Sequence, residues 1–259
     1  MRREALRLFL EAFGQPALQA ASAPGRVNLI GGHTDYNGGP VLPVAIGTRA
    51  TVAVGPGEPG ALDVVSAQVS LGRRPERIAW QETLAPGWGG YLAGVMRELW
   101  ALEAVPPGGG ARVAVASEIP MGVGLASSAA LAVAGARALA ALAGASLTPR
   151  QVAGVAFRAE HDQVGARCGL MDHAVAALAK PGRALLVECA SLATRYVPFS
   201  GRLLLVDTGV RRRDARSEAD RRRIECEAAV KALKVDLPEL HWLASWPVDW
   251  LARLKKRLP

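Results

Sequence analysis

The chain contains 259 residues, of which 50% are hydrophobic and 21% are charged, and it carries a net charge of +8. This composition excludes a largely disordered chain, and the length predicts one large domain or two small ones. Residues 125–142 form the longest apolar stretch, but Ser127 and Arg137 interrupt it, so no membrane-spanning helix is expected. Because Glu4 and Arg7 lie among the first apolar residues, we expect no secretory signal peptide and a cytoplasmic protein.

The spacing of apolar residues predicts most strands in the first half of the chain and most helices in the second half. This order favours the α+β class over a regular alternation of strand and helix. The predicted helices lie at residues 3–13, 91–103, 126–143, 149–163 and 217–234, with short helical segments near 238–245 and 247–258. The predicted strands lie at residues 27–30, 41–46, 50–54, 62–70, 77–81, 112–117, 184–189 and 202–207. Thr148 and Gln151 have the spacing of a capping box before the helix at 149–163.

The three cysteines predict neither a disulfide framework nor a zinc motif. Cys168, Cys189 and Cys226 are widely spaced, and their number is odd. We expect three reduced cysteines in packed positions.

Arginines are dense between residues 211 and 223. Such a run could contact nucleic acid phosphates, but it contains no aromatic residue for base stacking. Acidic residues such as Asp214, Glu218 and Asp220 are interleaved with the arginines. We therefore favour a solvated helix face with spaced ion pairs, and we expect no nucleic acid partner.

The strongest local signal is a glycine loop at residues 120–130, between a predicted strand and a predicted helix. Gly122 and Gly124 leave backbone N–H groups open to an anion, and the helix start adds unpaired donors. The hydroxyls of Ser127 and Ser128 could contact a phosphate or its metal ion. The loop lacks the Gly-Lys of a P-loop and the third glycine of the dinucleotide motif. A polyphosphate site is one interpretation, and a plain strand–turn–helix corner is the other.

A second polar segment, at residues 24–39, combines glycines with hydrogen-bonding side chains. His33, Asp35 and Asn37 crowd a short turn beside a strand, which suits a ligand with several hydroxyls. The alternative is an Asx-type turn that ends at Asn37-Gly38.

A third polar segment begins at Glu160 and ends at His173. Asp172 lies among apolar residues, where a carboxylate needs a partner. Glu160 follows a predicted helix and could reach a divalent cation. By themselves, these residues suggest a site without identifying it.

Together, the three segments resemble those of the GHMP small-molecule kinases and, among them, the galactokinases. Residues 25–43 (GRVNLIGGHTDYNGGPVLP) are similar to the galactokinase signature, and residues 120–130 to the ATP loop of the family. Residues 160–172 resemble the stretch with a metal-binding Glu and a catalytic Asp, and residues 210–227 resemble the segment that follows. The resemblance covers residues 5–230 approximately.

The resemblance implies the GHMP kinase fold and ATP-dependent phosphorylation of galactose, or a related sugar, at C1. It implies an α+β N-terminal domain at residues 1–195, followed by the start of an α/β sandwich domain at residues 196–259. ATP and Mg²⁺ are the implied cofactors, and a small-molecule sugar is the implied partner.

The resemblance also implies the residues that act in catalysis and in nucleotide binding. Asp172 would accept the proton of the sugar's C1 hydroxyl, and Arg26 would lie beside it. Ser128 and Glu160 would bind Mg²⁺, with Ser127 next to Ser128. Backbone N–H groups would bind the phosphates at Gly122, Val123, Gly124 and Leu125.

The implied sugar pocket contains His33, Asp35, Gly169 and Asp172. Galactokinases carry a Glu before the signature His, and that Glu reaches toward the sugar's C6 hydroxyl; this chain has Gly32 there. The chain also has His173 in place of Gln, and Ala219 in place of a sugar-contacting Tyr. Loss of hydrogen bonds at two of these positions predicts weaker sugar binding.

GHMP kinases carry a third, glycine-rich motif near their C-terminus, and this sequence contains no such motif after Asp207. We therefore expect a truncated C-terminal domain. Its exposed apolar surface would include Trp242, Trp246 and Trp250 and would favour self-association. The alternative function is a degenerate, non-catalytic protein that still binds sugar or ATP.

Overall fold

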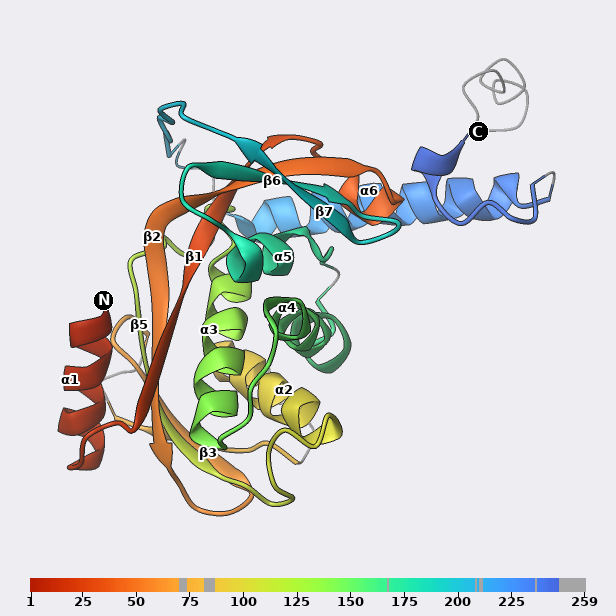
Figure 1. Ribbon diagram of the computed structural model, residues 1–259. Helices are drawn as coiled ribbons and strands as arrows, with labels where there is room; N and C mark the ends of the chain where they lie inside the picture. Colours follow the sequence, from red (N-terminus) through yellow and green to blue (C-terminus); the bar gives the residue numbers. More distant parts are fainter. Residues whose placement is uncertain are drawn as a thin grey trace. The chain divides into compact units, whose positions relative to one another are not determined.

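The computed structural model describes residues 1–69, 74–81, 87–166, 168–207, 209, 212–235 and 237–246, except the side chains of 212–220 (Figure 1). The chain divides into two compact units. The first unit comprises Met1–Val27 and Ala45–Lys180, and the second comprises Asn28–Val44 and Pro181–Pro259. The domain boundary expected near residue 195 is not tested by this division and stays a prediction.

The first unit contains a mixed β-sheet. In it, β5 pairs antiparallel with β2, from Ala50↔Ser117 to Pro56↔Ala111, and parallel with β3. Strand β4 pairs antiparallel with β3, and β1 pairs with β2. The strands are β1 (Gln19–Ile30), β2 (Pro40–Pro56), β3 (Ala61–Ser66), β4 (Glu76–Ala79) and β5 (Ala111–Ser117).

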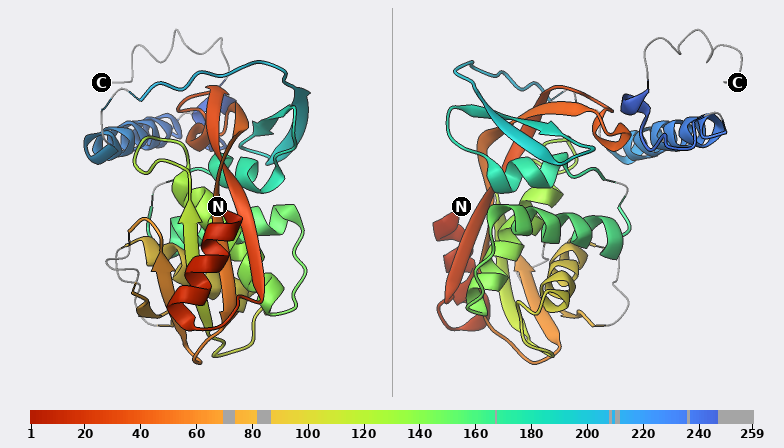
Figure 2. Two further views of the ribbon diagram at one scale, coloured as in Figure 1. Left: turned by 90° about the vertical axis from the view of Figure 1, so that its left-hand side faces the viewer. Right: turned by 45° about the vertical axis from the view of Figure 1, so that its right-hand side comes forward.

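Helices cover both faces of this sheet. Helix α1 lies on one face, and α2, α3 and α4 lie on the other, as Figures 1 and 2 show. The helices are α1 (Arg2–Phe13), α2 (Trp88–Ala101), α3 (Ser127–Leu142), α4 (Pro149–Arg158) and α5 (Met171–Leu178). A π-helical turn, η3 (Ala159–Gln163), follows α4 directly. Three layers therefore build the first unit.

The alternating sequence of β5 explains why two cores form. Val113 and Val115 point into the larger core with α2 and α3, whereas Ala114 and Ala116 point into a smaller core with Phe9 of α1. Successive side chains of a strand point to opposite faces, so a Val/Ala alternation produces one bulky face and one shallow face. The shallow face leaves room for the aromatic side chains of α1.

Helix α3 is buried along most of its length. Its alanines and Gly135 permit close packing, since a Cβ at Gly135 would lie 2.7 Å from Cδ2 of Leu92 in α2. A helix that is apolar all round is expected inside a core. This packing anchors the helix whose N-terminus follows the glycine loop.

The second unit contains a β-hairpin and the residues of the polar turn. Strand β6 (Arg183–Glu188) pairs antiparallel with β7 (Ala193–Pro198) and with the first residues of β2. The other elements are η1 (Asp35–Asn37), α6 (Arg212–Leu233) and η4 (Leu243–Ser245).

The described side chains of α6 form spaced ion pairs, as expected for a solvated helix face. Arg222 bonds to Glu225 at 2.8 Å, and Arg223 bonds to Glu227 at 3.0 Å. Such exposed pairs contribute little to stability, but they reduce the positive charge of the helix.

Several predicted strands differ from the structure. The two strands expected at 41–46 and 50–54 are the single strand β2, which continues through Gly47. The prediction of a strand at 202–207 is wrong, because these residues lie outside strands and Leu204 is 90% exposed.

Other elements differ from the prediction in length or were not predicted. The strand expected at 27–30 is the longer β1, and the helix expected at 149–163 ends as η3. Strand β7 and helix α5 were not predicted. The helical segment at 238–245 is reduced to η4, and the segment at 247–258 lies outside the described residues.

The three cysteines form no disulfide and are all half-buried, as the sequence predicts. Burial raises the pKa of the Cys189 thiol to about 12, with a smaller contribution from the negative charges of Asp35 and Glu188. Cys189 is therefore a protonated packing residue at neutral pH. Among the helices of the described part of the chain, none has the length and apolarity required to cross a bilayer.

The capping box at the start of α4 is confirmed and yields a stability prediction. The Gln151 backbone N–H donates to Thr148 Oγ1, and the Thr148 N–H donates to Gln151 Oε1. We expect Thr148→Ala to lower the free energy of unfolding by about 1 kcal/mol, because the capped N–H loses its acceptor. Thermal or urea unfolding measures this change. Thr148→Ser keeps the hydroxyl and should retain most of the stability; equal losses in both variants would contradict the role of the cap.

Candidate functional site

The glycine loop connects β5 to α3 within the first unit. Gly122 and Gly124 have φ values of 74° and 81°, in the left-handed region that favours glycine. A Cβ at either position would meet nothing within 4 Å. The backbone conformation, rather than lack of space, therefore explains both glycines.

The N-terminus of α3 is open toward this loop. Its N-cap residue, Ala126, has a φ of 59°, and no side chain caps the helix. Ser127 and Ser128 form the first helical turn. A helix start without a side-chain cap presents backbone N–H donors and the positive end of the helix dipole, which together suit a phosphate.

One arginine connects this loop to the carboxylate of α5. Arg26 Nε donates to Asp172 Oδ1 at 2.8 Å, and Arg26 Nη2 donates to Asp172 Oδ2 at 2.7 Å. Arg26 Nη1 also donates to the Gly124 carbonyl at 2.6 Å. Arg26 is only 8% exposed, whereas the Asp172 side chain is 22% exposed. The carboxylate is thus fixed in orientation by two hydrogen bonds and remains accessible.

The backbone of β1 approaches the loop closely at Gly25. A Cβ there would lie 2.8 Å from the Leu125 carbonyl oxygen, and the adjacent Arg26 N–H donates to the same oxygen at 3.1 Å. Glycine at residue 25 therefore permits both the backbone contact and the position of Arg26.

The polar turn of the signature lies in the second unit and is ordered by its own hydrogen bonds. His33 has a φ of 64°, and its Nδ1 is 2.7 Å from the Tyr36 hydroxyl. Asn37 Nδ2 donates to the His33 carbonyl at 2.8 Å, and Thr34 Oγ1 donates to Gly31 and Pro40 carbonyls. Asp35–Asn37 form a 3₁₀ turn that ends at Gly38, whose N–H donates to the Asp35 carbonyl.

Tyr36 and Gly38 of this turn pack against other residues of the second unit. A Cβ at Gly38 would lie 2.5 Å from Trp242 Cγ, and the Arg223 guanidinium lies 5.7 Å from the centroid of the Tyr36 ring. Burial raises the Tyr36 pKa, with smaller contributions from Cys226 and Asp35. His33 and Gly32 are exposed, so this part of the turn is open to a ligand.

The carboxylate of Glu160 lies in the first unit, on the π-helix η3. It is 6% exposed, and its Oε2 is 2.9 Å from His173 Nε2 of α5. Helix α3 contacts η3, so the serines at the start of α3 and Glu160 lie on contacting elements. Hydroxyl and carboxylate oxygens are the ligands that Mg²⁺ prefers, and the donor set therefore fits this ion.

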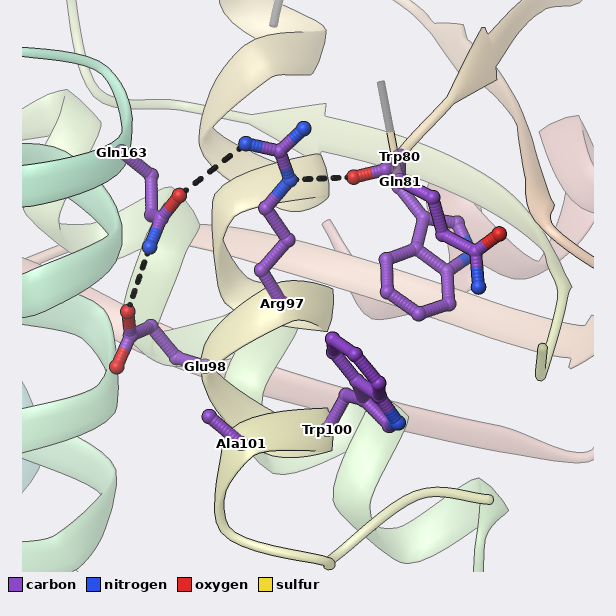
Figure 3. Close-up of a pocket in the computed structure, with 7 residues that line it drawn as sticks. All are labelled: Trp80, Gln81, Arg97, Glu98, Trp100, Ala101 and Gln163. Atoms are coloured by element: carbon purple, nitrogen blue, oxygen red, sulfur yellow. Dashed lines mark hydrogen bonds between the residues drawn. The ribbon is translucent and has the colours of Figure 1, made fainter. Parts of the chain in front are cut away.

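A polar network holds the π-helix against α2 and borders a cavity of about 570 Å³ (Figure 3). Gln163 of η3 donates to Glu98 at 2.9 Å and accepts from Arg97 at 3.3 Å, and Arg158 donates to Glu98 at 2.6 Å. A Cβ at Gly94 would lie 2.9 Å from the Ala159 carbonyl, so the two helices are in close contact. Because these polar groups already bond to one another, we assign the network to support of the π-helix.

Two features of the site have no counterpart in the sequence predictions. The amide oxygen of Asn28 in β1 is buried without a hydrogen-bond partner, although Asn28 belongs to the signature segment. His173 is fully buried as the partner of Glu160. His173 stands out in the sequence because galactokinases carry a Gln at this position. No pattern in the sequence, however, predicts its contact with Glu160, which lies 13 positions earlier.

Two family models match the chain in the segments just described. The galactokinase galactose-binding signature matches residues 7–56, and the N-terminal domain of GHMP kinases matches residues 91–180.

Galactokinases are also found among the curated relatives. The galactokinase of Chloroflexus aurantiacus is 40% identical over 256 residues, which cover 97% of this chain and 64% of that protein. The Homo sapiens galactokinase is 38% identical over 241 residues, with 89% of this chain and 60% of that protein covered. The chain thus spans less than two thirds of the length of these relatives.

Solved structures show the same fold. The structure of Lactococcus lactis galactokinase complexed with galactose matches with a TM-score of 0.81 at 22% identity, covering 98% of this chain and 67% of that one. A mevalonate kinase structure matches with a TM-score of 0.56 at 14% identity, covering 78% of this chain and 70% of that one. The predicted α+β fold is therefore confirmed as the fold of the GHMP kinases.

The close approach at Gly25 predicts a strong effect of a single methyl group. We expect Gly25→Ala to lower the free energy of unfolding by about 1–3 kcal/mol, because the new Cβ must displace the Leu125 carbonyl. Gly47→Ala is the matched control in the neighbouring strand β2, since a Cβ there meets nothing within 4 Å. Denaturant unfolding of both variants measures the difference, and similar losses would show that the contact with Leu125 is unimportant.

Proposed function

Because this chain belongs to the GHMP kinase family and carries the galactokinase signature, we propose that it is an ATP-dependent kinase that phosphorylates galactose at C1. The observation that carries the proposal is the paired Arg26 and Asp172 beside the Gly124 carbonyl. This arrangement joins a candidate base to a candidate phosphate loop.

Asp172 is the proposed general base. Arg26 uses one lone pair on each carboxylate oxygen, and each oxygen retains another lone pair for the proton of the sugar hydroxyl. Arg26 also provides a positive charge next to the phosphate loop, where negative charge moves during phosphoryl transfer. In this proposal one pair of side chains supplies both positioning and electrostatics.

The proposed ATP site is formed by the loop and by the start of α3. The backbone N–H groups of Gly122–Leu125 would bind phosphate oxygens, helped by the uncapped N-terminus of α3. Ser128 and Glu160 would hold Mg²⁺, with Ser127 as a neighbouring hydroxyl. When bound, the ion would neutralise part of the phosphate charge.

The proposed sugar-binding residues are His33 and Asp35 of the signature turn, in the second unit, and Gly169 and Asp172, in the first unit. The Lactococcus lactis galactokinase was solved as a complex with galactose, which supports a sugar as the substrate class. The presence of both members of the Arg26–Asp172 pair supports a catalytic protein over the non-catalytic alternative.

The base assignment yields the first activity prediction. We expect Asp172→Asn to lower kcat for sugar phosphorylation by about 10²–10⁴-fold, because an amide cannot accept the hydroxyl proton. ATP affinity should stay unchanged, since Asp172 lies outside the phosphate loop. A coupled ADP-release assay and calorimetry with ATP measure the two quantities.

Asp63 offers a matched control for this experiment. It forms the same bidentate pair with Arg77, at 2.8 and 3.0 Å, on strands β3 and β4. Asp63→Asn should retain full activity, because only an Asp–Arg pair outside the site is altered. Phosphorylation by Asp172→Asn at the rate of Asp63→Asn would refute the assignment.

Gly32 yields a prediction about sugar specificity. The Glu of galactokinases at this position reaches toward the C6 hydroxyl, so this chain should discriminate weakly between galactose and L-arabinose, which lacks C6. A side chain at Gly32 has open space, since a Cβ meets nothing within 4 Å. We expect Gly32→Glu to widen the galactose preference by about tenfold to a hundredfold, the effect of a hydrogen bond to a charged group.

The measurement compares kcat/KM for the two sugars in each protein. Gly32→Ala is the control, because it adds the Cβ without an acceptor and should leave the ratio unchanged. A strong galactose preference in the unaltered chain would contradict the proposed consequence of Gly32.

A further inference from the structure

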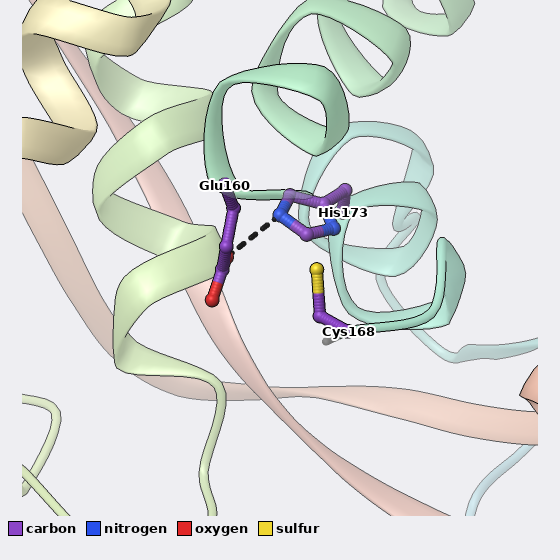
Figure 4. A group of neighbouring side chains, drawn as sticks. All are labelled: Glu160, Cys168 and His173. Carbon is purple, nitrogen blue, oxygen red and sulfur yellow. Dashed lines mark hydrogen bonds and ion pairs between the residues drawn. The ribbon is translucent and has the colours of Figure 1, made fainter. Parts of the chain in front are cut away.

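Three side chains of different chemistry meet behind the proposed base, within the first unit. One ligand atom each from Glu160, Cys168 and His173 lies within 4.8 Å of the other two. Figure 4 shows the three side chains pointing toward one another, from the π-helix η3, the following loop and helix α5. Cys168 has no role in the proposed phosphoryl transfer.

The imidazole of His173 meets the carboxylate of Glu160 inside this cluster. His173 is 0% exposed, its Nε2 is 2.9 Å from Glu160 Oε2, and its Nδ1 is buried without a hydrogen-bond partner. A metal ion can replace the proton between Nε2 and Oε2, because each of these two atoms then offers a lone pair to the ion.

From this geometry we propose that Glu160, Cys168 and His173 form a binding site for Zn²⁺. A thiolate, an imidazole and a carboxylate are the three kinds of ligand that bind Zn²⁺ in proteins, at about 2.0–2.3 Å. Three protein ligands leave a fourth position for water. Cys168 is half-buried, whereas Glu160 and His173 are buried.

The donor set distinguishes this site from the proposed Mg²⁺ site. Mg²⁺ prefers oxygen ligands and keeps several waters, whereas thiolate and imidazole select softer cations. The two sites share only Glu160. If the proposed function holds, Zn²⁺ at this site withdraws Glu160 from Mg²⁺ and weakens the binding of Mg-ATP.

The proposal is tested by metal binding to the whole chain under reducing conditions, without reference to activity. Co²⁺ is the probe, because it replaces Zn²⁺ and its bond to a thiolate produces a charge-transfer absorption. We expect one equivalent of Co²⁺ to produce this absorption and Zn²⁺ to abolish it by displacement. No thiolate absorption with the unaltered chain would overturn the proposal.

Variants identify the ligands. Cys168→Ser should abolish the thiolate absorption, and His173→Gln should weaken Co²⁺ affinity by at least about tenfold while keeping the thiol. Cys189→Ser is the matched control, since Cys189 is also a half-buried cysteine and should not alter binding. Thermal unfolding of each variant without metal checks that it is folded. Absorption that persists in Cys168→Ser, or unchanged affinity in a folded His173→Gln, would refute the site.

One further variant separates this proposal from the proposed function. Ser128→Ala should weaken the binding of Mg-ATP more than that of metal-free ADP, and it should leave the Co²⁺ titration unchanged. Failure of the ATP result with an intact Co²⁺ titration would count against the kinase assignment alone. Loss of Co²⁺ binding in Ser128→Ala would count against the three-residue site.

Discussion

A single buried guanidinium joins three elements of the first unit. Removing a charge from water is costly unless the charge is paired and its donors are satisfied. Arg26 meets this requirement through both oxygens of Asp172 and through the Gly124 carbonyl. These hydrogen bonds therefore fix the positions of strand β1, the glycine loop and helix α5 relative to one another. The same pairing that satisfies the arginine also orients the carboxylate proposed to take the sugar's proton.

Much of this arrangement could be predicted because its signals are local. The capping box at Thr148, the glycine loop and the following helix each depend on residues a few positions apart. The resemblance to galactokinases also singled out Arg26 and Asp172, which are 146 positions apart. Periodicity alone could not have paired them, since the contact exists only after β1 and α5 have packed.

The errors have physical causes in tertiary structure. Gly47 signals a break between strands, yet β2 continues because an exposed position needs no side chain to pack. Residues 203–206 are apolar enough for a strand, but a strand also requires a neighbour for its hydrogen bonds. The contact between Glu160 and His173 likewise depends on how η3 and α5 pack, which neither segment encodes by itself.

The π-helical turn at Ala159–Gln163 depends on the exact number of residues in its segment. A π turn closes each hydrogen-bonded ring with one more residue than an α-helix, so it is equivalent to a one-residue insertion in a regular helix. Deletion of one codon here would leave a helix with complete hydrogen bonding, but it would rotate the residues beyond it by about 100° relative to those before it. The carboxylate of Glu160 and the amide of Gln163 could then no longer both reach their present partners, His173 and Glu98. The length of this five-residue segment is therefore fixed by its tertiary contacts rather than by the helical propensity of its residues.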